Sequence, residues 1–326
     1  MSVPSSHLQA VLKAGHNDIQ VTGIGHVAVN VTDLSAAKAF YCDLLGFQED
    51  PAATLPHCGA HIVLRAASGQ RVALCHRPAW IPLAETGIHN AYRVTPAARD
   101  RIADRLRQAG VTILTYKEMR EAEQSDNFYC LDPSGNRVQL VASEVGGGAV
   151  EARASSDILI GGIDHVAVQA VDVEWQEKFY IGDIGLLATD VVGWRTADYL
   201  RARAWGEGKE DIAPGIMRWD KRFYVFPGQE PNVARVNVQL FLQAGNERLG
   251  IYLANKYFQE PPEHLAIGTP RFALTVKSRA DLDKIATLLR AGGRIIEGPT
   301  DHPPSSPWSC SLYCQDPGAN FLEFCC

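Results

Sequence analysis

The chain has 326 residues, of which 46% are hydrophobic and 21% charged, and its formal net charge is −6. This size and composition predict a globular protein of about two domains. The negative charge argues against a nucleic-acid partner, which usually meets a basic face of a protein.

Membrane and secretory features are absent from the sequence pattern. No run of about 18 apolar residues occurs, so no transmembrane helix or membrane partner is predicted. The first 18 residues lack the basic start and apolar core of a secretory signal. The eight cysteines form no CxxC pair, and reduced thiols in a cytoplasmic protein are expected.

Two similar phrases open the two halves of the chain. "GIGHVAVNVTDLSAAKAFYCDLLGF" covers residues 23–47, and "GIDHVAVQAVDVEWQEKFYIGDIGL" covers residues 162–186. The alternation in "HVAV" predicts a buried strand, and the apolar stripe that follows predicts a helix. An aspartate stands at each expected N-cap and a glycine at each helix end: Asp33 and Gly46, then Asp172 and Gly185.

The same plan recurs twice in fainter form, from His89 and from Arg271. Each of these copies ends in a closing strand, within residues 128–143 and 312–326, that follows an Asp-Pro turn. The sequence therefore predicts four βαβββ-like modules, which begin near Gly23, Gly87, Gly162 and Pro270.

The domain division follows from these repeats. We predict an N-terminal extension over 1–22, a two-module domain over 23–145, a Gly/Ser/Ala-rich linker over 146–160 and a second two-module domain over 161–326. An insert over about 194–235 lies in the third module. A lid, a contact in a homo-oligomer and an extended loop are the three roles open to it.

The paired openings and Asp-Pro turns resemble the vicinal oxygen chelate superfamily over nearly the whole chain after residue 22. This superfamily includes glyoxalase I and the extradiol ring-cleaving dioxygenases. The resemblance implies an α+β fold of two domains, in which paired modules form cup-shaped mixed sheets. It also implies a divalent metal inside a cup, with ligands from the first strand of each module and from the last strand.

The residues at these implied ligand positions depend on how the modules pair. The first strands offer His26, His89, His165 and Arg271, and the last strands offer Gln139 and Glu323. Pairing along the chain gives His89, Gln139 and His26 as the first choice, and His165 with Glu323 as the second. Crossed pairing instead gives His89, His165 and Gln139. His89 and Gln139 stay together in both arrangements.

Arg271 departs from the ligand pattern, because arginine stays protonated and has no lone pair to donate. One interpretation is a bidentate ion pair with Glu323 that fills the place of a metal. The other is that Arg271 binds the carboxylate of a substrate. Both alternatives remain open at the level of the sequence.

Three further residues are candidate catalytic groups. Tyr129 and Tyr313 each precede a last-strand position by ten residues, and the resemblance implies that such a tyrosine hydrogen-bonds a substrate oxygen. His302 lies in a Pro/Ser-rich loop and is a candidate acid or base.

The function that we predict is that of a mononuclear metal-dependent extradiol-type dioxygenase, with a small aromatic vicinal-oxygen molecule and O₂ as substrates. Fe(II) is the expected metal, with Mn(II), Zn(II) and Ni(II) as alternatives. A glyoxalase-like metal-assisted lyase or isomerase and a non-catalytic small-molecule-binding protein are the competing hypotheses, because one fold hosts many functions.

Overall fold

The computed structural model describes residues 18–80, 88–115, 127–143, 158–170, 173–192, 239–253 and 264–326. The predicted insert, Asp172 and residues 146–157 of the predicted linker lie outside these ranges. Every structural statement below concerns the described residues.

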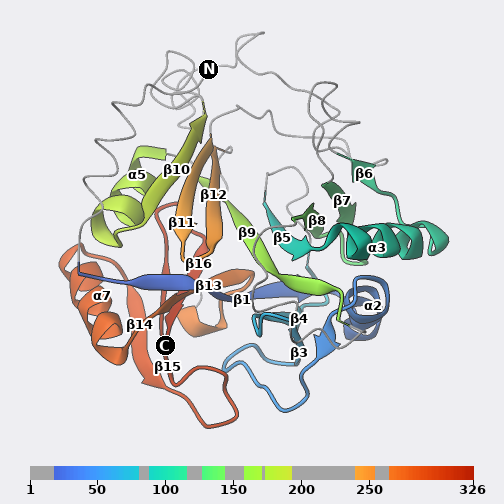
Figure 1. The fold of residues 1–326 in the computed structure, drawn as a ribbon. Helices are drawn as coiled ribbons and strands as arrows, with labels where there is room; N and C mark the ends of the chain where they lie inside the picture. The colour runs from blue at the N-terminus through green and yellow to red at the C-terminus, as the bar shows by residue number, and fades with distance from the viewer. Residues whose placement is uncertain are drawn as a thin grey trace.

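Two mixed sheets of eight strands form the described fold, as Figure 1 shows. The first sheet contains, in spatial order, β14 (Ile296–Asp301), β15 (Cys310–Gln315), β16 (Phe321–Cys325), β13 (Arg271–Val276), β1 (Val21–Val31), β4 (Arg71–His76), β3 (His61–Arg65) and β2 (Gln48–Glu49). The second contains β10 (Leu187–Val192), β11 (Gln239–Ala244), β12 (Glu247–Leu253), β9 (Ile160–Ala170), β5 (His89–Val94), β8 (Arg137–Ala142), β7 (Phe128–Leu131) and β6 (Leu114–Thr115). The α+β class is confirmed.

The modules pair in the crossed arrangement. Strand β1 of the first module runs antiparallel to β13 of the fourth, and β5 of the second runs antiparallel to β9 of the third. Each sheet therefore takes one module from each side of the 146–160 linker. The division at that linker separates modules along the sequence, and it does not separate the sheets.

The helices flank the sheets and begin and end at residues that the sequence indicated. The Asp33 side chain caps α2 (Leu34–Lys38), which continues as a π-helix over Ala39–Leu44. Gly46 and Gly185 adopt φ values of 85° and 88°, which favour glycine at a helix end. The remaining helical segments are α3 (Pro96–Gln108), α5 (Val173–Glu177), the π-helix Lys178–Asp183, the 3₁₀-helix Leu265–Ile267 and α7 (Arg279–Ala291).

The Asp-Pro turns join modules that belong to different sheets. Tyr41 of the first module donates a hydrogen bond to Asp132 at 3.2 Å, and Asn136 donates to the carbonyl of Asn30 at 2.8 Å. The other half repeats this arrangement with Tyr180 and Asp316 at 2.8 Å. The repeated "FY" and Asp-Pro elements are therefore two parts of one buried contact.

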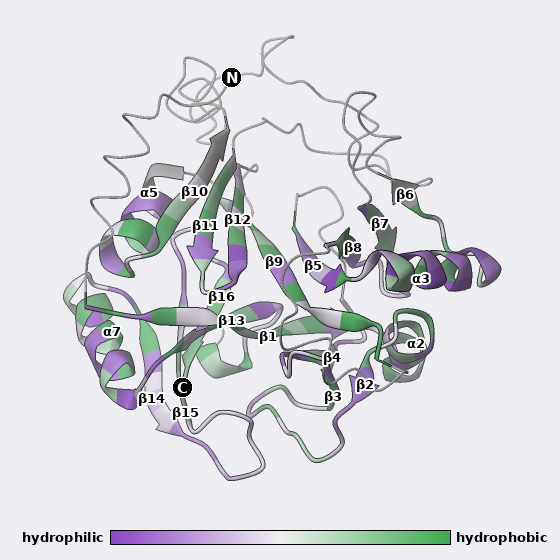
Figure 2. Ribbon diagram, viewed as in Figure 1, coloured by the Kyte–Doolittle hydropathy of each residue, from purple (hydrophilic) through white to green (hydrophobic). Residues whose placement is uncertain are grey.

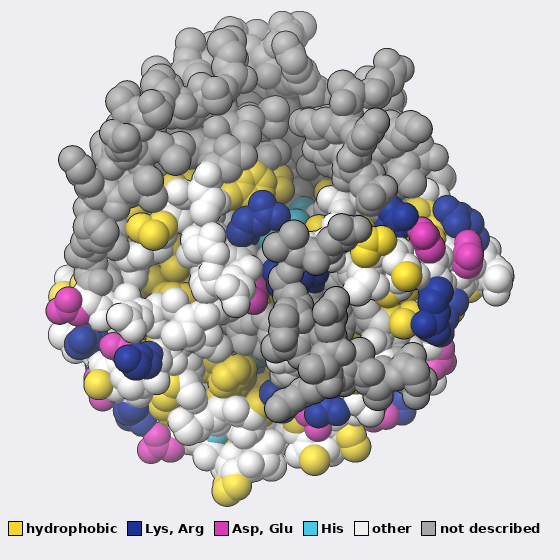
Figure 3. Space-filling model, in the orientation of Figure 1, with side chains coloured by type: hydrophobic (Ala, Val, Ile, Leu, Met, Phe, Trp, Pro, Cys, Tyr) yellow, Lys and Arg dark blue, Asp and Glu magenta, His cyan; other side chains and the backbone are white. Residues whose placement is uncertain are grey.

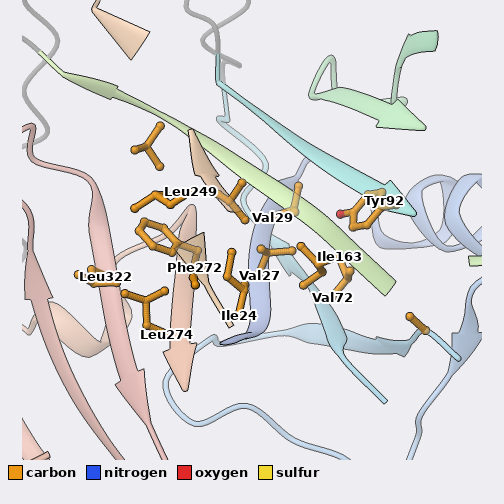
Figure 4. Close-up of a cluster of buried hydrophobic side chains, with 14 of the residues drawn as sticks. Ile24, Val27, Val29, Val72, Tyr92, Ile163, Leu249, Phe272, Leu274 and Leu322 are labelled. Atoms are coloured by element: carbon orange, nitrogen blue, oxygen red, sulfur yellow. The ribbon is translucent and has the colours of Figure 1, made fainter. Parts of the chain in front are cut away.

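The main core lies against the apolar faces of both sheets. Figure 4 shows Val27 and Val29 of β1 in a cluster with Ile163 of β9 and Leu249 of β12. Because side chains alternate along a strand, His26, between Gly25 and Val27, lies on the other face, away from this cluster. Figure 2 shows hydrophobic and hydrophilic residues interleaved along α7, which buries Leu282, Ile285 and Leu289 on one side.

Candidate metal centre

Three predicted ligands meet on one face of the second sheet. Ala91 of β5 lies beside Gln139 of β8 on one side and beside His165 of β9 on the other. His89 precedes Ala91 by two residues and therefore points the same way. The fold thus brings together His89, His165 and Gln139, which is the set that crossed pairing predicts.

The donor atoms of this set are close together and buried. The Nε2 atoms of His89 and His165 lie 3.0 Å apart. The side chains of both histidines and of Gln139 are buried, and Gln139 Oε1 has no hydrogen-bond partner among the described residues. A buried carbonyl oxygen without a partner is costly. Imidazole nitrogens and amide oxygens are both ligand atoms that divalent metals bind, so these residues fit a metal.

Asp164 fixes the orientation of the His165 ring. Asp164 Oδ1 lies 2.7 Å from His165 Nδ1, and the carboxylate also contacts Arg248 at 3.2 Å and Arg93 at 3.5 Å. Burial alone would raise the pKa of Asp164, but His165 and the two arginines hold this pKa well below its usual range. The ionised carboxylate therefore accepts the Nδ1 proton, so the Nε2 lone pair is directed at His89.

Two tyrosines stand beside the histidines. Tyr129 pairs with Gln139 across β7 and β8, and its ring lies edge-on to His89 with 5.5 Å between ring centroids. The Tyr252 ring is 6.1 Å from His89 by the same measure. Tyr129, a predicted catalytic residue, is therefore next to two of the three candidate ligands.

His26, the third member of the first-choice ligand set, lies in the other sheet. It pairs with Ala273 of β13, which in turn pairs with Glu323 of β16. The structure does not assemble His26 with His89 and Gln139, because crossed pairing places the first and second modules in different sheets. The second-choice pair is divided in the same way, with Glu323 beside His26 and His165 in the other sheet.

An ion pair lies on the face of the first sheet that carries His26 and Glu323, which we call the first-sheet cup. The face of the second sheet that carries His89, His165 and Gln139 is the second-sheet cup. Arg271 Nε and His26 Nε2 lie 3.0 Å and 3.2 Å from the same oxygen of Glu323, and the three side chains are almost fully buried. The Arg271–Glu323 pair expected from the sequence is present. The pair is not bidentate, because only Nε of Arg271 contacts the carboxylate while Nη1 and Nη2 contact other groups. The second carboxylate oxygen accepts a hydrogen bond from Ser311 at 2.6 Å.

The remaining donors of Arg271 are directed at the protein. Its Nη1 donates to the carbonyl of Ala266, and its Nη2 lies 3.4 Å from both the carbonyl of Pro56 and the sulfur of Cys58. A guanidinium that is 4% exposed and held in this way offers no free edge to a substrate carboxylate. The substrate-binding interpretation of Arg271 is therefore not supported by its surroundings.

His26 carries its proton on the nitrogen that faces Glu323. Trp308 Nε1 donates to His26 Nδ1 at 2.9 Å, and an indole N–H can only donate, so the neutral ring is protonated at Nε2. His26, Glu323 and Cys325 place potential ligand atoms within 4.8 Å of one another. The Arg271 guanidinium already provides the positive charge that a cation would bring to Glu323, and the His26 N–H faces the same carboxylate oxygen.

The charge on Glu323 is stable in this setting. Burial alone would raise the pKa of the carboxyl, but His26 and Arg271 outweigh burial and lower this pKa to about 2. The first-sheet cup is therefore an internally neutralised cluster, whereas the candidate ligands of the second-sheet cup, two imidazoles and an amide, carry no negative charge.

The other two predicted catalytic residues belong to the first-sheet cup. Tyr313 OH is 3.4 Å from His302 Nε2, and its ring lies 5.1 Å from the guanidinium carbon of Arg271. Burial raises the pKa of Tyr313 and lowers that of His302. Neither residue is in the sheet that carries His89 and His165.

Sequence reasoning missed Asp164 and Trp308. The signal for Asp164 was present, since the second phrase reads "GIDHVAV" where the first reads "GIGHVAV". A carboxylate directly before a candidate ligand is a typical orienting group. Nothing in the spacing indicated Trp308, which reaches His26 from a loop 282 residues away.

The described residues on the face drawn in Figure 3 show acidic and basic side chains interspersed. That face of the described chain therefore has no continuous basic patch of the kind that binds nucleic acid. No helix among the described residues is long and apolar enough to cross a membrane.

Comparison with known proteins gives the fold, together with a family match over part of the chain. The structure is similar to a candidate dioxygenase from Bacillus subtilis, with a TM-score of 0.59 and 12% identity over 94% of this chain and 85% of that one. It is also similar to glyoxalase I from Zea mays, with a TM-score of 0.54 and 13% identity over 96% and 94%. At these identities the likeness shows the fold alone. The comparison with curated proteins found no match.

The model of the Glyoxalase/Bleomycin resistance protein/Dioxygenase superfamily matches residues 23–140. This match covers the first two modules. The third and fourth modules, which repeat the same sequence plan, lie outside the matched residues. Residues 23–140 are therefore similar to the glyoxalase/bleomycin resistance protein/dioxygenase superfamily, and the chain shares its fold with the two structures above.

Proposed function

We propose that the protein is a metal-dependent dioxygenase that acts on a small aromatic molecule with two adjacent oxygens. In this proposal His89, His165 and Gln139 hold the metal. The observation that carries it is the 3.0 Å approach of two buried imidazole nitrogens, on the same sheet face as a buried amide oxygen that has no hydrogen-bond partner in the described part of the chain.

The donor set indicates the charge of the substrate. Two imidazoles and an amide are neutral, so the protein ligands leave the charge of a divalent ion unbalanced. A deprotonated vicinal diol would supply that negative charge and two oxygens together. Three protein ligands also leave coordination positions open. When bound, Fe(II) or Mn(II) would supply the redox-active centre that this reaction needs.

The protein's own residues would position and shield the substrate. Asp164 holds His165 in the tautomer whose Nε2 can act as a ligand. The Tyr129 ring stands beside His89 and Gln139, so its hydroxyl is the group that we assign to the hydrogen bond with a substrate oxygen. Tyr252 forms a second aromatic wall beside His89.

A glyoxalase-like isomerase is the second candidate, favoured by the shared fold and by the amide ligand. Isomerisation through an enediolate needs a base that removes a proton from carbon. Gln139 has no basicity, and Asp164 is ion-paired behind His165. Within the described part of the chain, the second-sheet cup therefore offers less for proton transfer than for binding a substrate that is already anionic.

The test begins with protein freed of metal and reloaded under argon with Fe(II), Mn(II), Zn(II) or Ni(II) in separate samples. O₂ consumption is followed with a panel of catechols, and isomerisation is followed with the hemithioacetal of methylglyoxal and glutathione. The dioxygenase proposal expects O₂ uptake with the Fe(II) or Mn(II) form only. Isomerisation without O₂ uptake would replace it with the second candidate.

A failure to retain any of the four metals would contradict both candidates and leave a binding protein. The two variants are His165→Ala, which removes a proposed ligand, and His26→Ala, which changes the equivalent histidine of the other sheet. Only the first is expected to abolish O₂ uptake.

A further inference from the structure

Two cysteines face each other across the last pair of strands of the first sheet. Ser311 of β15 pairs with Cys325 of β16, so Cys310 and Cys326 are the next pair along the ladder. The Cys326 N–H donates to the carbonyl of Cys310 at 3.1 Å, and the two Sγ atoms are 2.6 Å apart. The backbone therefore already holds these thiols in the cross-strand arrangement of a disulfide.

The two cysteines of the pair differ from each other in their access to solvent. Cys326 is partly exposed, while Cys310 beneath it is buried. Their neighbour Cys325 points to the opposite face, where its Sγ lies 3.9 Å from the carbonyl of Leu274. A soluble reagent can thus reach Cys326 first and meet Cys310 only through it.

We propose that Cys310 and Cys326 are a site of reversible disulfide formation, with glutathione disulfide as the chemical class of oxidant. The Cys326 thiolate attacks one sulfur of the oxidant, forms a mixed disulfide and releases one glutathione thiolate. The Cys310 thiol then loses its proton to solvent and attacks the Cys326 sulfur, which releases the second glutathione. Two protein thiols are oxidised and one small disulfide is reduced, so electrons and atoms balance.

The chemistry of the two sulfurs suits this order. Burial and the contact with Cys326 raise the pKa of the Cys310 thiol to about 11, which disfavours direct attack by Cys310 on a dissolved oxidant. Once Cys326 carries glutathione, the closeness of the sulfurs makes the second step intramolecular. Figure 1 marks the end of the chain next to β15, so the new bond would join β16 to β15 close to that end.

Disulfide formation would link β15 covalently to β16 in the sheet that carries Glu323 and Tyr313. The bond restricts the unfolded chain, so oxidation should raise the thermal midpoint of unfolding. The ligands proposed for the metal lie in the other sheet. Oxidation should therefore leave metal content unchanged, and the inference stands or falls separately from the proposed function.

The experiment treats the full-length protein with glutathione disulfide and then blocks the remaining thiols. Peptide mass mapping identifies the linked cysteines, and thermal unfolding is measured before and after treatment with dithiothreitol. We expect a Cys310–Cys326 peptide, the loss of two titratable thiols and a higher midpoint that dithiothreitol reverses. Cys326→Ser and Cys310→Ser should each abolish the shift, while Cys42→Ser, which changes another partly exposed cysteine, should retain it.

Two results would overturn the proposal. One is a stable glutathione adduct on Cys326 in wild-type protein, since it would show that Cys310 does not complete the exchange. The other is a shift in the midpoint that persists in both Cys326→Ser and Cys310→Ser, with mass mapping that links other cysteines. Both variants are compared, so poor folding of one does not decide the outcome.

Discussion

Arg271 occupies in the first sheet the position that His89 occupies in the second. Each is the first residue of its strand and stands two residues before an alanine that pairs with a histidine, His26 in one sheet and His165 in the other. The same backbone framework therefore presents a permanent cation in one cup and a lone-pair donor in the other.

Replacing His165 should remove the metal. His165→Ala deletes one of three proposed ligands, and we expect affinity to fall by more than the ~10–100-fold typical of outer-shell changes. Metal analysis after dialysis measures it. His26→Gln is the control, and stoichiometric metal in His165→Ala together with its loss in His26→Gln would move the site to the first sheet.

Removing the carboxylate behind His165 should weaken the metal site without destroying it. Asp164→Asn keeps the shape of the side chain but removes its negative charge, and the new amide N–H can donate to His165 Nδ1 and so favour the other tautomer. We expect roughly 10–100-fold weaker binding, measured by competition with a chelator dye. Equal metal affinities of the variant and the wild type would show that Asp164 forms ion pairs with Arg93 and Arg248 but does not affect metal binding through His165.

Placing a charge on the amide ligand should strengthen binding. Gln139→Glu introduces a carboxylate beside the two imidazoles and completes the facial set preferred by Fe(II). An increase in affinity of about tenfold or more is expected, which corresponds to about 1.4 kcal/mol. Tyr129→Phe, which changes the neighbouring side chain on β7 but no ligand, should leave the affinity near that of wild type. A decrease in Gln139→Glu would place Gln139 outside the coordination sphere.

Breaking the first-sheet ion pair should destabilise the fold. Arg271→Met leaves Glu323 buried without its main cation, and such a loss costs about 3–5 kcal/mol. The free energy of unfolding in urea measures it. The double variant Arg271→Met with Glu323→Gln should recover part of the loss, and a double variant less stable than the single one would contradict a charge-based explanation.

The Arg271–Glu323 ion pair predicts that the free energy of unfolding depends on pH. The pKa of Glu323 is about 2 in the fold and 4.5 in its ordinary state, so the folded protein binds fewer protons at this group between these values. Its stabilising contribution is complete above pH 4.5 and is lost as the pH falls toward 2. The difference in unfolding free energy between wild type and Glu323→Gln should therefore shrink on acidification. A constant difference down to about pH 3 would contradict the lowered pKa.

Much of the fold was predictable because the patterns that encode it are local. Strand alternation, helical stripes, the Asp33 cap and the stops at Gly46 and Gly185 all lie within a few residues of the elements they define. The pairing of β1 with β13 joins segments about 250 residues apart, and no local pattern specifies it. Crossed and uncrossed pairing therefore remained alternatives until the structure resolved them.

The candidate site was predictable in its positions and not in its grouping. The repeats located the strand positions of His89, His165 and Gln139, but grouping them required the strand order. The polar contacts that decide the role of each cup come from loops and from neighbouring strands, as with Trp308 on His26 and Ser311 on Glu323. Such contacts have no fixed sequence spacing, so only the three-dimensional structure could assign them.

Crossed pairing makes each half of the chain comparable to one protomer of a dimer that exchanges modules with its neighbour. In a dimer of identical half-chains every substitution would appear in both cups at once. A single covalent chain removes this constraint, so Arg271 could replace an imidazole in one cup while His89 remained in the other. One sheet then carries an internal ion pair, and the other carries the side chains that we propose to hold a metal.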